Sequence, residues 1–180
     1  MSSSWVLPGA QFDELLRSFR RRAWRWECQG TYRQPAEAEP WRRWRAGEPD
    51  DLAWLRPWLD QVAAATREGR SIARVRVFRE PPTEYQRWQL EVGEANVAAG
   101  EDVRVLPESR ARSLGLPTHD FWIFDEARVA LMHFEDQQFA GSEIIASPEE
   151  VNRYLRWWGT ACEHAVPLLA YRHEVIGRRR

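Results

Sequence analysis

The chain has 180 residues, of which 43% are hydrophobic, 29% charged and 12% aromatic, and its formal net charge is −1. This balance excludes a disordered or collagen-like chain, and no apolar run approaches the ~18 residues that a membrane-spanning helix needs. The length fits one domain that can fold without a metal or a disulfide. We expect a single domain over 1–180, with an N-terminal helical part at about 9–68, a sheet-containing part at about 70–170 and a frayed tail at 171–180.

Three helices are predicted in the first third of the chain. Apolar residues recur at helical spacing over 9–28, which predicts a helix that Gly30 would end. Two further helices are expected over 36–46 and 50–68. Pro57 lies inside the second of these and could kink or divide it.

The hydrophobic pattern changes to a period of two at residues 71–79. Arg74 and Arg76 alternate there with valines, which predicts a strand with one polar face. Thr83 is placed to cap the helix that follows. The next expected elements are a helix at about 84–99, a strand at 102–106 and a helical turn at 108–114.

The run Asp120–Asp125 is apolar between its two acids and predicts a strand buried on both faces. Strands at 128–134 and 139–145 would follow it as an antiparallel meander. A Ser-Pro-Glu-Glu segment then predicts the start of a last helix, at about 149–170. Together these elements predict an α+β (or α/β) fold. We expect a mixed sheet of about five strands with an antiparallel C-terminal meander, on which the N-terminal helices and the long C-terminal helix pack.

Several catalytic classes are excluded by residues that the sequence lacks. All 26 basic residues are arginine, so there is no P-loop, Schiff-base or kinase-type lysine. Cys28 and Cys162 form no CxxC pair, and no HExxH or GxSxG segment occurs. The first ten residues lack the basic and apolar regions of a secretory signal. We therefore expect a cytoplasmic protein that holds neither a metal nor a cofactor.

Arg74 and Arg76 are the first candidates for a functional site, because both would point to the same face of their strand. If that face is covered, their guanidinium groups need either carboxylates or an anionic ligand. Two interpretations stay open: a structural arginine–carboxylate network and an anion pocket. The candidate acids are Glu101, Asp102, Asp120 and Asp125, and the pocket would also be lined by Tyr85 and Arg87.

Two other functions have weaker support. The same four acids, with His133, could act as acid–base catalysts or hold a metal, but acids at strand ends are more often turn and capping residues. The segments RRRAWRW and WRRWR could stack on and contact nucleic acid. The charge bias is mild, however, at +4 over residues 1–80 and −5 over 81–180. Helix faces with buried tryptophans and solvated arginines, some in cation–π pairs, explain these segments equally well.

Three segments of the chain, RVRVFREPPTEYQRW, NVAAGEDVRVL and LPTHDFWIFDE, carry a family resemblance. They resemble the actinobacterial domain-of-unknown-function family 6879, over about Phe12 to Pro167. That family has no assigned activity, and its members are often encoded beside helix-turn-helix regulators, which implies a regulatory or interaction role. The matching positions at which we expect a pocket or interface are Arg74, Arg76, Glu80, Tyr85, Arg87, Glu101, Asp102, Arg104, Asp120 and Asp125.

A weaker resemblance, of fold alone, links the DFWIFD strand, its hairpin and the last helix to non-catalytic relatives of the phospholipase-D fold. Without lysine, such a relative has lost that chemistry. Taken together, the sequence favours a non-catalytic binding or regulatory protein that receives an anionic ligand or an acidic segment of a protein partner, a helix-turn-helix regulator being one candidate. The alternatives are a small enzyme of a natural-product pathway and a nucleic-acid-binding module. A homodimer is also compatible with the sequence, whereas a membrane location is not.

Overall fold

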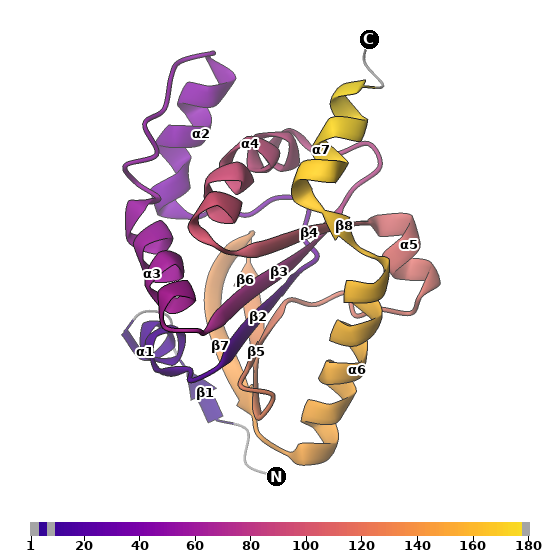
Figure 1. Cartoon of the computed structure of the whole chain (residues 1–180). Coiled ribbons are helices and arrows are strands. Elements are labelled where there is room, and N and C mark those ends of the chain that lie inside the picture. The colour runs from indigo at the N-terminus through magenta and orange to yellow at the C-terminus, as the bar shows by residue number, and fades with distance from the viewer. Residues whose placement is uncertain (1–3, 7–9, 178–180) are drawn as a thin grey trace.

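The fold is organised around a mixed β-sheet with helices on both faces (Figure 1). The computed structural model describes residues 4–6 and 10–177. The strands are β1 (Ser4–Val6), β2 (Arg22–Glu27), β3 (Ser71–Phe78), β4 (Asp102–Pro107), β5 (Phe121–Phe124), β6 (Arg128–Glu135), β7 (Gln138–Ile145) and β8 (Val166–Pro167). The helices are α1 (Ala10–Ser18), the 3₁₀ helix η1 (Pro35–Glu37), α2 (Ala38–Arg45), α3 (Arg56–Arg67), α4 (Glu84–Ala99), α5 (Glu108–Ser113), α6 (Pro148–His164) and α7 (Leu168–Gly177).

In the described part of the chain the sheet has eight strands, in the order β1-β7-β6-β5-β2-β3-β4-β8. Strands β2, β3 and β4 are parallel to one another, whereas every other pairing is antiparallel. The predicted mixed sheet and the β5-β6-β7 meander are confirmed. The expected number of five strands was too low, because it included only β3 to β7.

Strand β2 lies at the centre of the sheet and corrects the helix predicted over 9–28. Only α1 of that segment is helical, and Arg22–Glu27 pairs with β3 on one side and β5 on the other. The sequence RAWRWE also has a period of two, and Ala23 and Trp26 are buried on opposite faces. Pairing on both edges and burial on both faces therefore override the helical spacing.

The C-terminal region differs from the prediction as well. The helix expected over 149–170 ends at His164, and Val166 and Pro167 pair with β4 as β8. Ala165 is extended (ψ 144°), which stops α6. The next residue, Val166, precedes Pro167 and is therefore held out of the helical region. The tail expected to fray at 171–180 instead belongs to α7 as far as Gly177.

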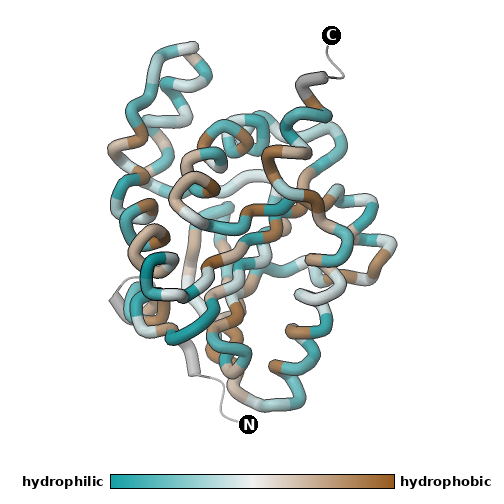
Figure 2. The backbone as a smooth tube through the Cα atoms, viewed as in Figure 1, coloured by the Kyte–Doolittle hydropathy of each residue, from teal (hydrophilic) through white to brown (hydrophobic). Residues whose placement is uncertain are grey.

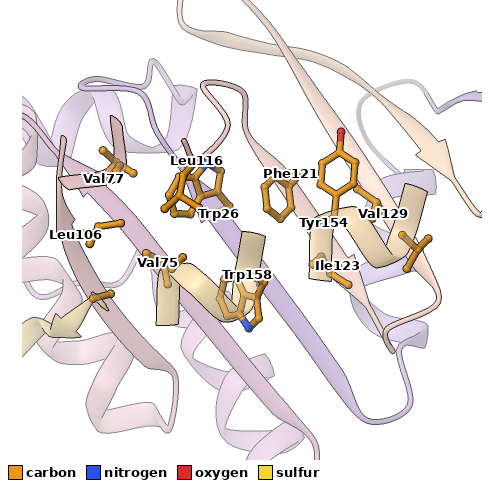
Figure 3. Close-up of a cluster of buried hydrophobic side chains, with 14 residues drawn as sticks. Trp26, Val75, Val77, Leu106, Leu116, Phe121, Ile123, Val129, Tyr154 and Trp158 are labelled. Atoms are coloured by element: carbon orange, nitrogen blue, oxygen red, sulfur yellow. The ribbon is translucent and has the colours of Figure 1, made fainter. Parts of the chain in front are cut away.

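Helices α5 and α6 cover one face of the sheet over an apolar core (Figure 3). Tyr154 and Trp158 of α6 point onto Phe121 and Val75 of the strands. Trp158 also stacks on Trp24 of β2, with ring centroids 5.2 Å apart. Figure 2 shows that the hydrophobic stretches of the trace gather along the central strands. This face is therefore filled by side chains of the core.

Helices α1, α3, α4 and α7 cover the opposite face, and α2 packs against α4. No helix in the described residues is both long and apolar enough to cross a membrane. Helix α4 spans the predicted residues, because Thr83 and Gln86 form a capping box at its start and Gly100 ends it in the left-handed region (φ 111°). Gly100 sets the direction of the chain into Glu101, which is buried beneath this face.

The Gly100→Ala variant is expected to lose about 2–3 kcal/mol of unfolding free energy. The cause is twofold: alanine is strained at φ 111°, and its Cβ would lie 2.4 Å from Thr66 Oγ1. Gly47→Ala is the matched control, because Gly47 also has a positive φ (70°) but no atom would lie within 4 Å of the added Cβ. The unfolding free energies of both variants can be measured by urea unfolding, with tryptophan fluorescence as the signal. An equal loss in the two variants would contradict the close approach to Thr66.

Candidate functional site

Charged side chains lie on the face of the sheet that α1, α3 and α4 cover. In the parallel register, Arg25 of β2 is opposite Arg74 of β3, and Glu27 is opposite Arg76. Side chains of alternate residues share a face, so all four lie next to one another beneath the helices. Arg25, Glu27 and Arg76 are each at most 9% exposed, and the side chain of Arg74 is 11% exposed. The sheet therefore buries three guanidinium groups within a few residues of one another.

Glu27 is the central carboxylate of this cluster. Its oxygens lie 2.6 Å from Arg74 Nη1, 2.9 Å from Arg76 Nε and 3.6 Å from Arg25 Nε. Burial alone would raise the pKa of Glu27, but the three positive charges outweigh burial and lower the pKa to about 2. Glu27 is therefore ionised at neutral pH and holds the three arginines together.

Glu101 neutralises Arg74 from the other side. Its Oε1 accepts a hydrogen bond from Arg74 Nε at 2.7 Å, while its Oε2 accepts from Trp58 Nε1 at 3.1 Å and from Asn96 Nδ2 at 2.9 Å. Glu101 is 2% exposed. Each of its oxygens thus has a donor, as a buried carboxylate requires.

Asp120 has the same role for Arg25. Its Oδ2 accepts from Arg25 Nη2 at 2.7 Å and from Tyr32 Oη at 2.6 Å, and its Oδ1 accepts from the backbone N–H and the thiol of Cys28. Burial and the charge of Asp120 raise the pKa of Cys28 and of Tyr32. Cys28 is consequently a protonated hydrogen-bond donor, and its thiol is not activated as a nucleophile.

The sequence left two interpretations open, a structural arginine–carboxylate network and an anion pocket. The distances in the structure fit the arginine–carboxylate network. Three guanidinium groups lie within ion-pair distance of three carboxylates, so their formal charges balance. The arrangement brings together five of the predicted site residues: Arg74, Arg76, Tyr85, Glu101 and Asp120.

The other five predicted residues lie outside the arginine–carboxylate network, and each makes contacts of its own. Asp102 pairs with Arg104, and Asp125 accepts hydrogen bonds from the backbone N–H groups of Arg20, Arg21 and Arg22. Glu80 accepts from the backbone N–H of Ser109, and Arg87 donates to the carbonyl of Pro82. Asp102, Asp125 and Glu80 are therefore turn, capping and surface residues and do not form one acidic centre with Glu101 and Asp120.

A cleft of about 330 Å³ opens over the charged network. Its floor contains Arg25, Glu27, Arg74 and Arg76, and Tyr32, Gln34, Glu37 and Tyr85 line its polar side. Its other side is apolar, with one exposed acid, Asp13, at its edge. The apolar residues are Phe12, Trp122, Met132, Phe134 and Phe139, which come from α1 and from strands β5, β6 and β7.

Sequence reasoning missed Arg25 and Glu27 because it assigned their segment to a helix. The missed signal is the period of two in RAWRWE, the same period that identified Arg74 and Arg76. Tyr32 and Glu37 follow β2 in a connection of irregular structure and a 3₁₀ turn. Their place at the cleft depends on long-range contacts, such as that of Tyr85 Oη with Glu37 Oε2, and no sequence pattern gives it.

Among the described residues, two groups that line the cleft are incompletely paired: Glu37 has no ion-pair partner, and one nitrogen of Arg25 has no hydrogen-bond partner. Glu37 accepts from Tyr85 Oη at 2.7 Å and weakly from Gln89 Nε2 at 3.5 Å, both uncharged donors. Burial raises the pKa of Glu37, despite the hydrogen bond from Tyr85 and the charge of Arg76. Arg25 Nη1 is buried and has no hydrogen-bond partner. The cleft is thus lined by a carboxylate without a nearby cation, Glu37, and by an arginine, Arg25, with one nitrogen that no acceptor reaches.

The Arg/Trp-rich helix α2 makes internal contacts. Arg42 pairs with Glu39 at 2.7 Å, and Arg45 lies over the ring of Trp41, 4.9 Å from its centroid. The interpretation as helix faces with cation–π pairs therefore accounts for these residues. Within the described residues, no group of three or more His, Cys, Asp or Glu side chains could hold a metal ion.

The low pKa of Glu27 predicts how the fold responds to acid. In the unfolded chain Glu27 titrates near 4.5, so the stabilisation from the network is complete above pH 4.5 and is lost as the pH falls from 4.5 to about 2. The difference corresponds to about 3 kcal/mol of unfolding free energy. Carboxyl-carbon NMR should show Glu27 titrating near pH 2, and urea unfolding should show the loss. Glu27→Gln should flatten this dependence, and titration of Glu27 near 4.5 would contradict the geometry.

The structure is similar to that of NucT from Helicobacter pylori, with a TM-score of 0.52, 11% sequence identity and coverage of 92% of this chain and 98% of that chain. A structural likeness at this sequence identity shows a shared fold only. Among curated proteins, no sequence matches this chain. The sequence pattern of the family described as "Domain of unknown function (DUF6879)" matches residues 10–173. The resemblance carried by the RVRVFRE and DFWIFDE segments is thereby confirmed, and the chain belongs to the DUF6879 family.

Proposed function

We propose that the protein is a non-catalytic binding protein whose ligand is a small molecule held in the cleft over the arginine–carboxylate network. The observation that carries this proposal is Arg25, which lines a cleft of about 330 Å³ and whose buried Nη1 has no hydrogen-bond partner. Buried polar groups are nearly always hydrogen-bonded. A ligand acceptor would complete this one.

The composition of the cleft supports a small-molecule ligand. Ligand sites usually have about 300–1,000 Å³, mostly apolar walls and a few placed polar groups. Here Phe12, Phe134 and Phe139 line the apolar wall, while Arg25 and Glu37 supply polar groups. The network beneath them fixes the guanidinium groups by ion pairs with Glu27, Glu101 and Asp120. The floor of the cleft is therefore rigid before the ligand arrives, which lowers the entropy cost of binding.

The network also limits the charge of the ligand. Because the charges of the three arginines are already balanced, a multiply charged anion would compete with the internal carboxylates. A ligand with one carboxylate-sized acceptor and an apolar body fits the cleft better than an acidic protein segment does. A regulatory partner, such as the helix-turn-helix regulator that the resemblance implied, would then respond to occupancy of the cleft.

The enzyme and nucleic-acid alternatives have less support. Acid–base catalysis was expected from acids that lie in separate places, and several of them are fully used in hydrogen bonds. Nucleic-acid binding was expected from the segments RRRAWRW and WRRWR. In the first, Arg25 is buried in the network, and in the second, Arg42 pairs with Glu39 and Arg45 stacks on Trp41. Neither alternative explains why a cleft opens over three buried arginines.

Native mass spectrometry of the protein from its own host, before extensive dialysis, tests the proposal directly. A small bound mass is expected, and the same compound should bind the purified chain in calorimetry. Phe139→Ala should weaken that binding about tenfold, because one aromatic contact is lost from the apolar wall.

Trp157→Ala is the matched control, since Trp157 is also a half-buried aromatic residue but lies on α6, against the opposite face of the sheet. It should leave the affinity unchanged. Equal effects of the two substitutions would place the ligand outside the cleft. Failure to detect any bound small molecule, in the native sample and in a metabolite library, would overturn the proposed function.

A further inference from the structure

The proposed function leaves the chemistry of the ligand open, and the two sides of the cleft define it. We propose that the ligand is a zwitterionic amino acid with a large apolar side chain, whose ammonium binds Glu37 and whose carboxylate binds Arg25. This inference rests on the proposed function and adds the ligand class. It depends on three features of the cleft: a carboxylate without a nearby cation, a guanidinium nitrogen without a hydrogen-bond acceptor, and an apolar wall.

Glu37 is the acceptor. In the described part of the chain, no arginine or histidine nitrogen lies within 4.0 Å of its carboxylate. Its two donors, the hydroxyl of Tyr85 and the amide of Gln89, are neutral. A partly buried carboxylate without a cation is destabilised by loss of water, and the raised pKa of Glu37 reflects this. A ligand ammonium would supply the missing positive charge.

Arg25 is the donor. Its Nη2 is taken by Asp120 at 2.7 Å and its Nε lies 3.6 Å from Glu27, so its orientation is fixed from two sides. Only Nη1 is left without a partner. The planar guanidinium recognises carboxylates through such N–H groups. A ligand carboxylate could therefore be bound without breaking either internal ion pair.

The charge balance favours a ligand with both charges. Arg25, Arg74 and Arg76 are matched by Glu27, Glu101 and Asp120, which leaves Glu37 as the additional acid inside the cleft, with the exposed Asp13 at its edge. A pure anion would face Glu37 and Glu27 without compensation, and a pure cation would face three arginines. A zwitterion places each charge beside its opposite and leaves the net charge of the site unchanged.

The apolar wall would hold the side chain. Phe12 lies 5.5 Å from Phe139 and 6.4 Å from Trp122 between ring centroids, and Phe134 lies 5.9 Å from Phe139. These rings form a continuous apolar surface beside the polar floor. A cavity of about 150 Å³ accommodates benzene, so about 330 Å³ gives room for a ring together with an amino-acid head group. An aromatic side chain would meet these rings edge to face.

Calorimetry with three matched probes tests the ligand class. L-Phenylalanine carries both charges, phenethylamine lacks the carboxylate and 3-phenylpropionate lacks the ammonium, while all three share the same ring. We expect L-phenylalanine to bind at least tenfold more tightly than either analogue. Equal binding of the three probes, or tighter binding of either analogue, would overturn the inference.

Two variants locate the ammonium. Glu37→Gln keeps the shape of the side chain and should weaken the binding of L-phenylalanine about tenfold, whereas the binding of 3-phenylpropionate should become no weaker, because a repelling charge is removed. Tyr85→Phe keeps the charge of Glu37, so it should preserve the preference for the zwitterion, and it serves as the second variant if Glu37→Gln does not fold. Loss of the preference in Tyr85→Phe with Glu37 intact would contradict the assigned role of the carboxylate.

The outcomes separate this inference from the proposed function. If no free amino acid binds but another compound from a metabolite library does, and Phe139→Ala weakens it, the ligand class is wrong and the proposed function stands. If no compound of any class binds in the cleft, both fail.

Discussion

The burial of three guanidinium groups on one face of the sheet is the constraint on which the rest of the structure depends. A buried charge without a partner is strongly unfavourable, so each arginine requires a carboxylate within ion-pair distance. Glu27 meets this need from the same strand as Arg25, and Glu101 and Asp120 meet it from the two sides. Loss of any one of these acids would leave an uncompensated charge beneath the helices.

The fold supplies these three carboxylates from different elements. Glu27 comes with the central strand β2, Glu101 follows the left-handed Gly100 at the end of α4, and Asp120 precedes β5. The parallel register of β2 and β3 then places Arg25 beside Arg74 and Glu27 beside Arg76. The opposite face is apolar and holds α6 in place. The sheet therefore separates a packing face from a polar face, and the cleft over the arginine–carboxylate network lies on the polar face.

Local signals explain what could be predicted from the sequence. Thr83 and Gly100 lie at the two ends of α4, so both of its limits were predicted, and the alternation around Arg74 and Arg76 identified β3 and the face that they share. Strand β2 was missed because Ala23 and Trp26 continue the helical spacing of the preceding apolar residues and also fit an extended strand, and only pairing with β3 and β5 decides between the two. Arg25 and Glu27 were lost with it. Glu37 reaches the cleft through contacts with Tyr85 and Gln89, which are 48 and 52 residues away, and no local pattern contains that information.

A structural network and a binding site are often treated as alternatives, yet in this cleft one depends on the other. The ion pairs of Glu27, Glu101 and Asp120 fix the guanidinium groups, so a ligand need not order flexible side chains. These ion pairs also occupy most of the donors and acceptors of the network. Arg25 Nη1 remains without a hydrogen-bond partner, and the carboxylate of Glu37 remains without a positively charged partner. Under the proposed function, the neutrality of the network would make the site selective, because a ligand would have to satisfy Arg25 and Glu37 without disturbing the pairs beneath them.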